Sequence, residues 1–268
     1  MAGTWDAIVL DDYVAVMPLA WRKKWGIRYL YQPAFTQQGG IFFKKKLPPS
    51  VQSEMLKKAL SHFPFSEIAL NYLNKLSHSS AVFTERNNFI LALNEPYEVL
   101  AASFDSIAVK NLKRAKNASL TYQPGEDFAA SIHLYQELYS RRQPSFNARD
   151  FANFSMLCEG LAKQDAVLVR NVFSKASVLL ATAILLKDGG RIYNVVSCVT
   201  KDGRLAQANY FLYDSVIREF AGTACVLDFE GSDVKGIATF YQRFAPVAQP
   251  YPFVKLNNLP GVVKLFKR

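Results

Sequence analysis

A run of apolar residues, SVLLATAILL, extends from Ser177 to Leu186 and ends at the turn signal KDGG. Such a run is too short for a membrane-spanning helix, which needs about 20 apolar residues, so we expect a buried strand. Residues 166–173 and 191–199 have a similar extended pattern, and the short turns SKAS and KDGG join the three segments. Strands joined by such turns pair with their neighbours in opposite directions, so the sequence predicts an antiparallel meander.

Helices and strands alternate around this meander in the second half of the chain. An apolar stripe that includes Tyr213, Val216 and Phe220 predicts a helix, and Ile237 and Phe240 begin the apolar face of another. The expected order is two helices, the meander, a helix, a strand, a helix and a strand, at residues 127–141, 148–163, 166–199, 208–220, 224–227, 237–244 and 252–256.

The first half combines short strands with helices. Strands are expected at residues 5–10 and 13–18, with Asp11 and Asp12 in the turn between them. Ser50 precedes a predicted helix and is suited to cap it. The whole chain is therefore expected to be of the mixed α/β (α+β) class, and the other elements of this half lie at residues 26–42, 51–62, 67–73, 81–93, 97–118 and 119–123.

The length of 268 residues favours two domains, and we place the boundary between residues 105 and 106. The net charge of +10 is distributed unequally between these parts. Residues 106–268 carry 21 Lys and Arg against 13 Asp and Glu, whereas residues 1–105 carry 11 against 9. A positive field attracts phosphate-bearing partners, which leaves open a CoA-type donor, a tRNA, or no specific partner.

The sequence lacks the motifs of several classes of protein. Cys158, Cys198 and Cys225 are odd in number and form no CxxC pair, which is typical of reduced thiols in a cytoplasmic protein. The histidines are isolated, so no metal site is expected. Patterns of nucleophilic hydrolases and nucleotide-binding loops are missing too. The N-terminus has no basic segment before an apolar one, so it does not read as a signal peptide.

The order of elements in the second half, together with several short motifs, resembles one enzyme family. The segment from Gln207 to Pro260 has a helix, a short strand ending in D-x-x-G, and then G-x-x-x-F-Y-x-x-F. The runs VKNLKRAKNASL and YLYQPAFTQQGGIF add to the pattern. Together they resemble the Fem-type and related GNAT-like N-acyltransferases, which pair two GNAT-like domains in one chain.

The resemblance implies a fold and a function. It implies two tandem GNAT-like domains, each a mostly antiparallel central sheet flanked by helices. Residues 1–105 would form a degenerate copy and residues 106–268 the acyltransferase domain. The implied function is transfer of an acyl or aminoacyl group from CoA or tRNA to a small-molecule or peptide amine, and neither carrier is expected to stay tightly bound. The alternative is a non-catalytic binding module of the same fold for a small or anionic ligand.

Asp228 and Glu230 are the predicted catalytic residues. In an extended strand both would point to one face, with Phe229 on the other. Two carboxylates beside an acceptor amine would hold it or take its proton during attack on an acyl carbonyl. The alternative is that they cap the next helix or pair with a nearby arginine.

Arg204, Gln207 and Asn209 are the predicted contacts of the donor phosphates. They lie at the start of the helix over residues 208–220, and a helix N-terminus attracts anions. The glycine-rich pyrophosphate loop of GNAT enzymes is absent from this position, where the sequence is RLAQANY, which argues against ordinary acetyl-CoA binding. The alternative is that Asn209 simply caps the helix.

Further residues are predicted to bind the acceptor, and each of them also has a structural interpretation. Ser232 is expected in the turn and as the N-cap of the next helix, Tyr241 in the core, and Arg243 either on an anion or in solvent. The basic helix end around residues 110–116 is either a solvated face or a tRNA contact. The acceptor-site residues are Arg141, Phe229, Ser232, Tyr241, Arg243 and, in a cleft between the domains, Gln37.

Overall fold

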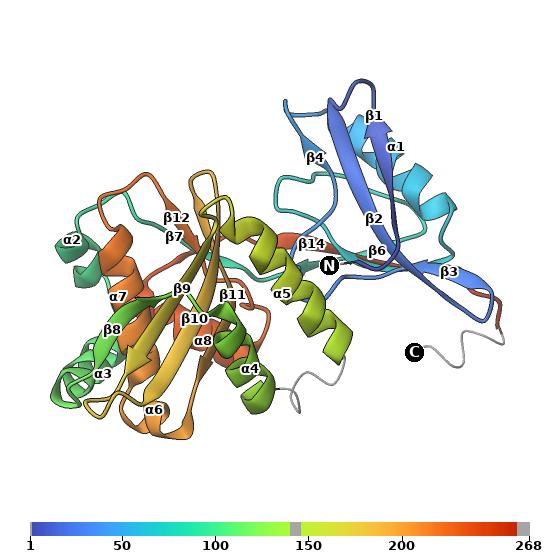
Figure 1. Cartoon of the computed structure of the whole chain (residues 1–268). Helices are drawn as coiled ribbons and strands as arrows, with labels where there is room; N and C mark the ends of the chain where they lie inside the picture. Colours follow the sequence, from blue (N-terminus) through green and yellow to red (C-terminus); the bar gives the residue numbers. More distant parts are fainter. Residues whose placement is uncertain (1, 140–145, 262–268) are drawn as a thin grey trace. The chain divides into compact units, whose positions relative to one another are not determined.

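The computed structural model describes residues 2–139 and 146–261 of the chain (Figure 1). The chain divides into two compact units. Unit 1 comprises Met1–Asn87 with Gln249–Arg268, and unit 2 comprises Asn88–Ala248. The boundary predicted from the sequence lies 18 residues later. The sequence left open which domain holds the C-terminal strand, and in the structure this strand pairs within the sheet of unit 1.

Unit 1 is built on one seven-stranded sheet with the strand order β1-β2-β3-β5-β14-β6, and β4 pairs with β2. All neighbours are antiparallel except β3 and β5. The inner face of β2 buries Ala15, Met17 and Leu19 in one core with Leu56 of α1. The elements are β1 (Trp5–Leu10), β2 (Ala15–Lys24), β3 (Ile27–Leu30), β4 (Phe42–Phe43), α1 (Pro49–Ser61), β5 (Phe65–Ala69), β6 (Val82–Arg86) and β14 (Tyr251–Asn257).

Side-chain amides organise the irregular segment between β3 and β4, which was expected to be extended. The amide of Asn74 donates to the carbonyl of Ile41 (2.8 Å) and accepts from its N–H (2.9 Å). Asn71 donates to the carbonyls of Gly39 (3.1 Å) and Ile41 (2.8 Å). Gly40 has φ +85°, and a Cβ there would lie 2.3 Å from Oδ1 of Asn74, so the position requires glycine. The buried N–H and carbonyl of Ile41 are thus satisfied without a strand partner.

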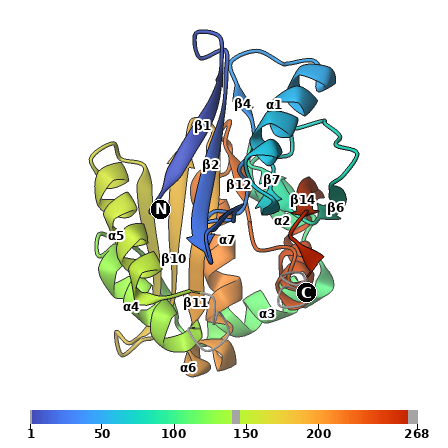
Figure 2. The ribbon, with the colours of Figure 1, turned by 90° about the vertical axis from the view of Figure 1, so that its right-hand side faces the viewer.

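Unit 2 contains the predicted meander inside a second seven-stranded sheet, ordered β13-β7-β12-β11-β10-β9-β8. Helices α4 and α5 cover one face of this sheet and α7 covers the other (Figure 2). The elements are β7 (Phe89–Ala92), α2 (Tyr97–Ala102), α3 (Ser106–Asn117), β8 (Thr121–Gly125), α4 (Phe128–Tyr139), α5 (Ala148–Ala162), β9 (Val167–Phe173), β10 (Leu179–Asp188), β11 (Arg191–Val199), α6 (Lys201–Leu205), α7 (Ala208–Phe220), β12 (Val226–Asp228), α8 (Lys235–Tyr241) and β13 (Val247–Ala248).

The predicted fold class is confirmed, since both units have mostly antiparallel sheets flanked by helices. Two local features differ from what the sequence indicated. Residues 81–93, expected as one strand or as two with a turn at ERNN, form β6 and β7, which belong to different sheets. The segment TKDG at residues 200–203, expected as the turn that closes the meander, opens the short helix α6, where Thr200 Oγ1 accepts from the N–H of Gly203 (3.0 Å). Within the described residues, no helix combines the length and apolar character needed to cross a membrane.

Candidate functional site

Two parallel strands part in the middle of the sheet of unit 2. Strand β12 pairs with β11 only from Arg191 to Tyr193, and it ends at Asp228, opposite Tyr193. Strand β11 continues to Val199. Its register with β10 skips Val195, which marks a β-bulge directly after the point of separation. Bulges re-aim side chains and are frequent beside active sites. We call this place, where β11 and β12 separate, the fork.

A buried network of hydrogen bonds fills the fork. Nδ2 of Asn194 lies 2.7 Å from the hydroxyl of Tyr213, 2.9 Å from that of Tyr241, and 3.1 Å from the carbonyl oxygen of Phe229. The hydroxyl of Tyr213 also donates to Ser197 (2.9 Å). Oδ1 of Asn194 is buried and has no hydrogen-bond partner in the described part of the chain.

Neither Asn194 nor Ser197 was identified from the sequence. The available signal was a polar residue, Asn194, between Ile192 and Val196 on a strand whose alternate positions are otherwise buried and apolar. A buried amide in such a position needs several partners, which is a reason to expect a polar network around it.

Asp228 is held rigidly at the end of β12, with 1% of its surface exposed. Its Oδ1 accepts from Nδ2 of Asn88 (3.0 Å) and from the N–H of Glu230 (3.1 Å). Its Oδ2 lies 3.6 Å from a guanidinium nitrogen of Arg191 and has no hydrogen-bond partner among the described residues. Burial raises the pKa of Asp228, and these three neighbours act in the opposite direction. The arginine pairing foreseen as the alternative is present.

Glu230 lies beyond the strand instead of on it. Its φ of +47° places it in the left-handed region, so Asp228 and Glu230 do not share one strand face as predicted. The residue is half-buried. Burial, reinforced by the negative charge of Asp228 and opposed by Arg191, raises the pKa of Glu230 to about 8. This carboxyl group can therefore exchange a proton near neutral pH.

The start of α7 carries the three predicted donor contacts. The helix follows Gln207, which has φ +61°, and no side chain caps it. Nε2 of Gln207 donates to the carbonyl of Arg204 (3.1 Å), and the Arg204 side chain is exposed at the end of α6. Asn209 is the second residue of the helix, so the alternative in which it caps α7 is wrong.

No family model and no curated protein matches the chain. Solved structures do match. FemX is similar over 98% of this chain and 91% of its own, with a TM-score of 0.66 and 13% identity. L-PGS from Bacillus licheniformis covers 98% of this chain and 88% of its own, with a TM-score of 0.59 and 12% identity. A C-terminal domain from Agrobacterium fabrum, described as that of a lysylphosphatidylglycerol synthetase, covers 98% of this chain and 87% of its own. Its TM-score is 0.58 and its sequence identity 11%.

The chain has the Fem-type, GNAT-like fold. At 11–13% sequence identity the similarity concerns the fold alone. The site residues are therefore judged by their hydrogen bonds, burial and charges. Within this Fem-type fold, most of the residues predicted to bind the acceptor are buried or pair with other residues of the chain. Phe229 is fully buried, with its ring centroid 4.7 Å from that of Tyr241. Tyr241 is buried in the fork network.

Ser232 and Arg243 also contact the chain itself. Ser232 is buried, and its hydroxyl donates to the carbonyl of Glu230 (3.1 Å). It does not cap α8 as predicted, because the N-cap of that helix is Val234. Arg243 forms an ion pair with Asp105 (3.0 Å), the residue that caps α3. Their substrate roles remain predictions.

The last two predicted residues, Gln37 and Arg141, are not among the described residues of unit 2. Gln37 belongs to unit 1, in the half-buried segment between β3 and β4. Arg141 lies outside the described residues. Among the described residues, no group of three or more His, Cys, Asp and Glu side chains is arranged to hold a metal ion.

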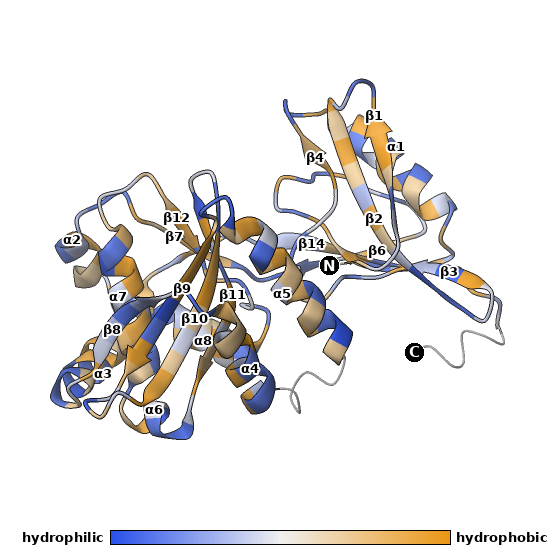
Figure 3. Cartoon of the chain, viewed as in Figure 1, coloured by the Kyte–Doolittle hydropathy of each residue, from blue (hydrophilic) through white to orange (hydrophobic). Residues whose placement is uncertain are grey.

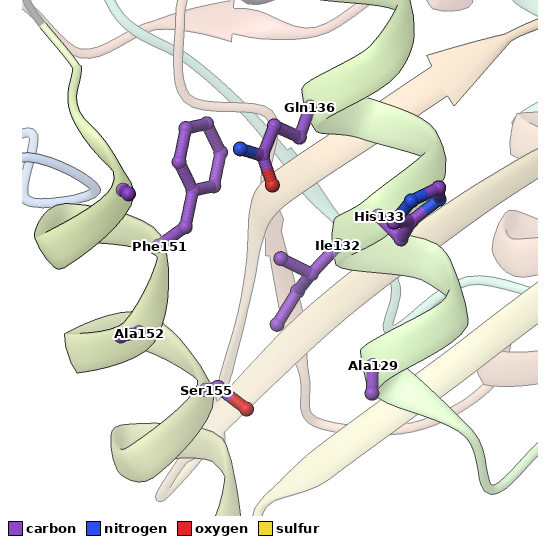
Figure 4. A pocket seen from close by; sticks show the side chains of 8 residues that line it. Ala129, Ile132, His133, Gln136, Phe151, Ala152 and Ser155 are labelled. Carbon is purple, nitrogen blue, oxygen red and sulfur yellow. The ribbon is translucent and has the colours of Figure 1, made fainter.

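A shallow hollow of about 270 Å³ lies between α4 and α5 of this Fem-type fold. The side chains of Gln136 and Phe151 approach each other across it (Figure 4). None of the predicted site residues lines the hollow, which is formed by Ala129, Ile132, His133, Gln136, Ala148, Phe151, Ala152 and Ser155.

Proposed function

We propose that the chain is an acyltransferase that moves an acyl or aminoacyl group from a carrier to an amine, at the fork of unit 2. The observation that carries the proposal is the placement of Glu230 beside the fork, where Oδ1 of the buried Asp228 accepts from its N–H (3.1 Å); its pKa, raised to about 8, suits proton transfer at neutral pH. The fold supports it, because the lysylphosphatidylglycerol synthetase with this fold is named for joining a lysyl group to a lipid.

Glu230 would act as the proton acceptor. A primary amine is mostly protonated at neutral pH and must lose a proton before its lone pair attacks the acyl carbonyl carbon. The carboxylate of Glu230 takes this proton. A carbon–nitrogen bond then forms, and the bond between the carbonyl carbon and the carrier's sulfur or oxygen breaks. The nitrogen must then lose a second proton to become the amide, and the leaving thiolate or alkoxide takes this one. Glu230 releases the first proton to water, so the protons balance.

Asp228 would position Glu230 instead of touching the acceptor. Its Oδ1 holds the backbone N–H of Glu230, and its charge helps to raise the pKa of Glu230. Arg191 limits this rise from the other side. A buried carboxylate held by several donors has little freedom to move, which suits a supporting role.

The carrier would bind at the start of α7. The N–H groups of its first turn lack a side-chain cap, and Arg204, Gln207 and Asn209 lie beside them. The absence of a glycine-rich loop favours aminoacyl-tRNA over acetyl-CoA as the carrier. The exposed Lys110, Lys113, Arg114 and Lys116 of α3 add positive charge without an acidic residue in that helix.

A non-catalytic binding module is the second candidate. The observation that favours it is the filling of the fork, since the rings of Tyr213 and Tyr241 are buried where a substrate would enter. In that case the fork network serves stability alone. Three free cysteines agree with a reducing compartment, and we keep the cytoplasm as the proposed location in both cases.

Transfer assays distinguish the two candidates. The protein is incubated with labelled acyl-CoA or aminoacyl-tRNA and a panel of amines and peptides, and amide formation is followed. We expect transfer with one carrier and its loss in Glu230→Gln. The exposed Glu126→Gln in the same unit is the matched control and keeps the activity. Carrier binding without transfer to any acceptor, equal in wild type and Glu230→Gln, supports the binding module and contradicts the transferase.

A further inference from the structure

One face of the sheet in unit 1 is apolar over β1, β4 and the first part of β2, although it faces outward. Strand pairing places residues of β1 opposite residues of β2, with Trp5 opposite Ala20, Ala7 opposite Pro18 and Val9 opposite Val16, and it places Phe42 of β4 opposite Val16. Residues opposite each other in register lie on the same face of a sheet. We call this set the outer face; its members are Trp5, Ala7, Val9, Val16, Pro18, Ala20 and Phe42.

The outer face is exposed. Trp5 exposes 64% of its surface, Phe42 52% and Val9 44%. The alternate residues of β2, which include Met17 and Leu19, point the other way into the core. A sheet with one buried face normally carries polar residues on the other, so seven neighbouring apolar residues on the outer face require an explanation.

Basic residues continue and border the outer face. By the alternation of β2, Arg22 and Lys24 follow Ala20 on the same side, and both are exposed. Lys44, Lys45 and Lys46 come directly after β4 and are exposed as well. Figure 3 shows the hydrophobic colours of β1 and β2 near their turn and the hydrophilic far end of β2.

Exposed aromatic residues and a few acidic residues stand at the edges. Tyr13 and Trp25 expose 62% and 68% of their surfaces, beyond the two ends of β2. Asp6 is opposite Leu19 and therefore belongs to the other face, while Asp11 and Asp12 lie in the turn between β1 and β2. The outer face itself carries no acidic side chain.

We propose that the outer face docks the protein on the surface of an anionic lipid bilayer. Apolar and aromatic side chains enter the boundary between headgroups and acyl chains, and lysines beside them attract anionic headgroups. A second copy of the chain fits less well, because it would bring the same basic residues to the contact. A nucleic acid fits less well, because Ala7, Val9 and Val16 offer it neither charge nor an aromatic ring. This surface is independent of the proposed acyl transfer.

Vesicle binding tests the proposal on the full chain. The protein is sedimented with vesicles of equal parts phosphatidylglycerol and phosphatidylcholine, and with vesicles of phosphatidylcholine alone. We expect binding to the first and much weaker binding to the second. Changing Lys44, Lys45 and Lys46 to Gln should weaken binding on the order of a hundredfold. Trp5→Ser combined with Phe42→Ser should weaken it at least about tenfold.

Matched variants keep the test specific. Trp5→Phe retains an apolar ring and should bind like the wild type, while brominated lipid should quench tryptophan fluorescence less in this variant. Met156→Ser removes an apolar residue that is 68% exposed in unit 2 and should change nothing. The changed side chains are exposed, so thermal unfolding should be unaltered. Three results would overturn the proposal: no binding to anionic vesicles, equal loss of binding in Met156→Ser, or concentration-dependent self-association abolished by Trp5→Ser.

Discussion

Each unit contains a buried network of polar side chains, and the two networks differ in how completely they are satisfied. In unit 1, the amide of Asn74 has a backbone partner for its oxygen and another for its nitrogen, and so does that of Asn71. In unit 2, Oδ1 of Asn194 and Oδ2 of Asp228 are buried without hydrogen-bond partners among the described residues.

The difference separates structure from function. An amide that satisfies buried backbone groups stabilises the fold, and nothing is left over to bind a ligand. Buried acceptors without donors cost free energy, and a fold keeps them where another role compensates. The unit 1 network is therefore assigned to stability, and the fork network, with Glu230 beside it, to the proposed chemistry.

The largest effect is expected for Asn74→Ala in unit 1. The change leaves the buried N–H of Ile41 without a partner and removes one of the two amide donors to its carbonyl, the other being Asn71, and we expect a loss of about 2–4 kcal/mol in unfolding free energy. Urea denaturation measures it, and the exposed Asn94→Ala serves as the control. A loss as small as that of the control would contradict the structural assignment of this network.

Glu230 should give the next largest effect, through pH. Its pKa is about 8 in the folded chain and about 4.5 when unfolded, so the folded state binds the extra proton between these values and stability falls as pH rises. Between pH 6 and pH 7.5 the wild type should lose about 2 kcal/mol relative to Glu230→Gln. Denaturation at the two pH values measures this difference.

The same titration has a kinetic consequence. If the carboxylate of Glu230 takes the acceptor's proton, kcat/KM should rise with pH up to about 8 and then level off. Carbon-13 NMR of the labelled carboxyl group reports its pKa directly. A midpoint near 4.5 would remove both the stability slope and the proposed role of Glu230.

Asn194→Leu should lower the unfolding free energy by less than the same change at Asn74. Asn194 already leaves its oxygen unsatisfied, and the hydroxyls of Tyr213 and Tyr241 retain each other (3.1 Å) and Ser197 as partners. A loss of about 1–2 kcal/mol is expected, against more than about 2 kcal/mol for Asn74→Leu. Equal losses at the two sites, measured by the same denaturation experiment, would erase the distinction between the networks.

The sequence predicted elements that depend on neighbouring residues. The meander followed from an apolar run and two turns, and its three strands lie where they were expected. The helix over residues 208–220 followed from its apolar stripe. Such patterns are local, so they survive without knowledge of the rest of the chain.

Features that depend on distant partners were missed. Residues 81–93 look like one extended segment, with or without a turn at ERNN, yet β6 pairs with β14, more than 160 residues later, and β7 pairs with β12. Glu230 was identified as a candidate, but its raised pKa arises from burial and from Asp228 in a left-handed turn that no local pattern indicated. The hydrogen bonds of Asn194 reach Tyr213 and Tyr241 through the fold alone.

The smallest effect is expected at Arg243, which the sequence assigned to the substrate. Its guanidinium pairs with Asp105, whose side chain also accepts from the N–H of Ala108 (2.7 Å) as the cap of α3. In having its partner within the chain, Arg243 resembles the satisfied amides of unit 1 more than the unsatisfied Asn194 and Asp228 of the fork. Because the carboxylate of Asp105 is 42% exposed, solvent screens the pair, and Arg243→Gln should cost only about 0.5–1 kcal/mol. Transfer activity should be unchanged, with Asp105→Asn, which keeps a capping side chain, as the matched variant. A loss of activity in Arg243→Gln but not in Asp105→Asn would return Arg243 to the substrate site.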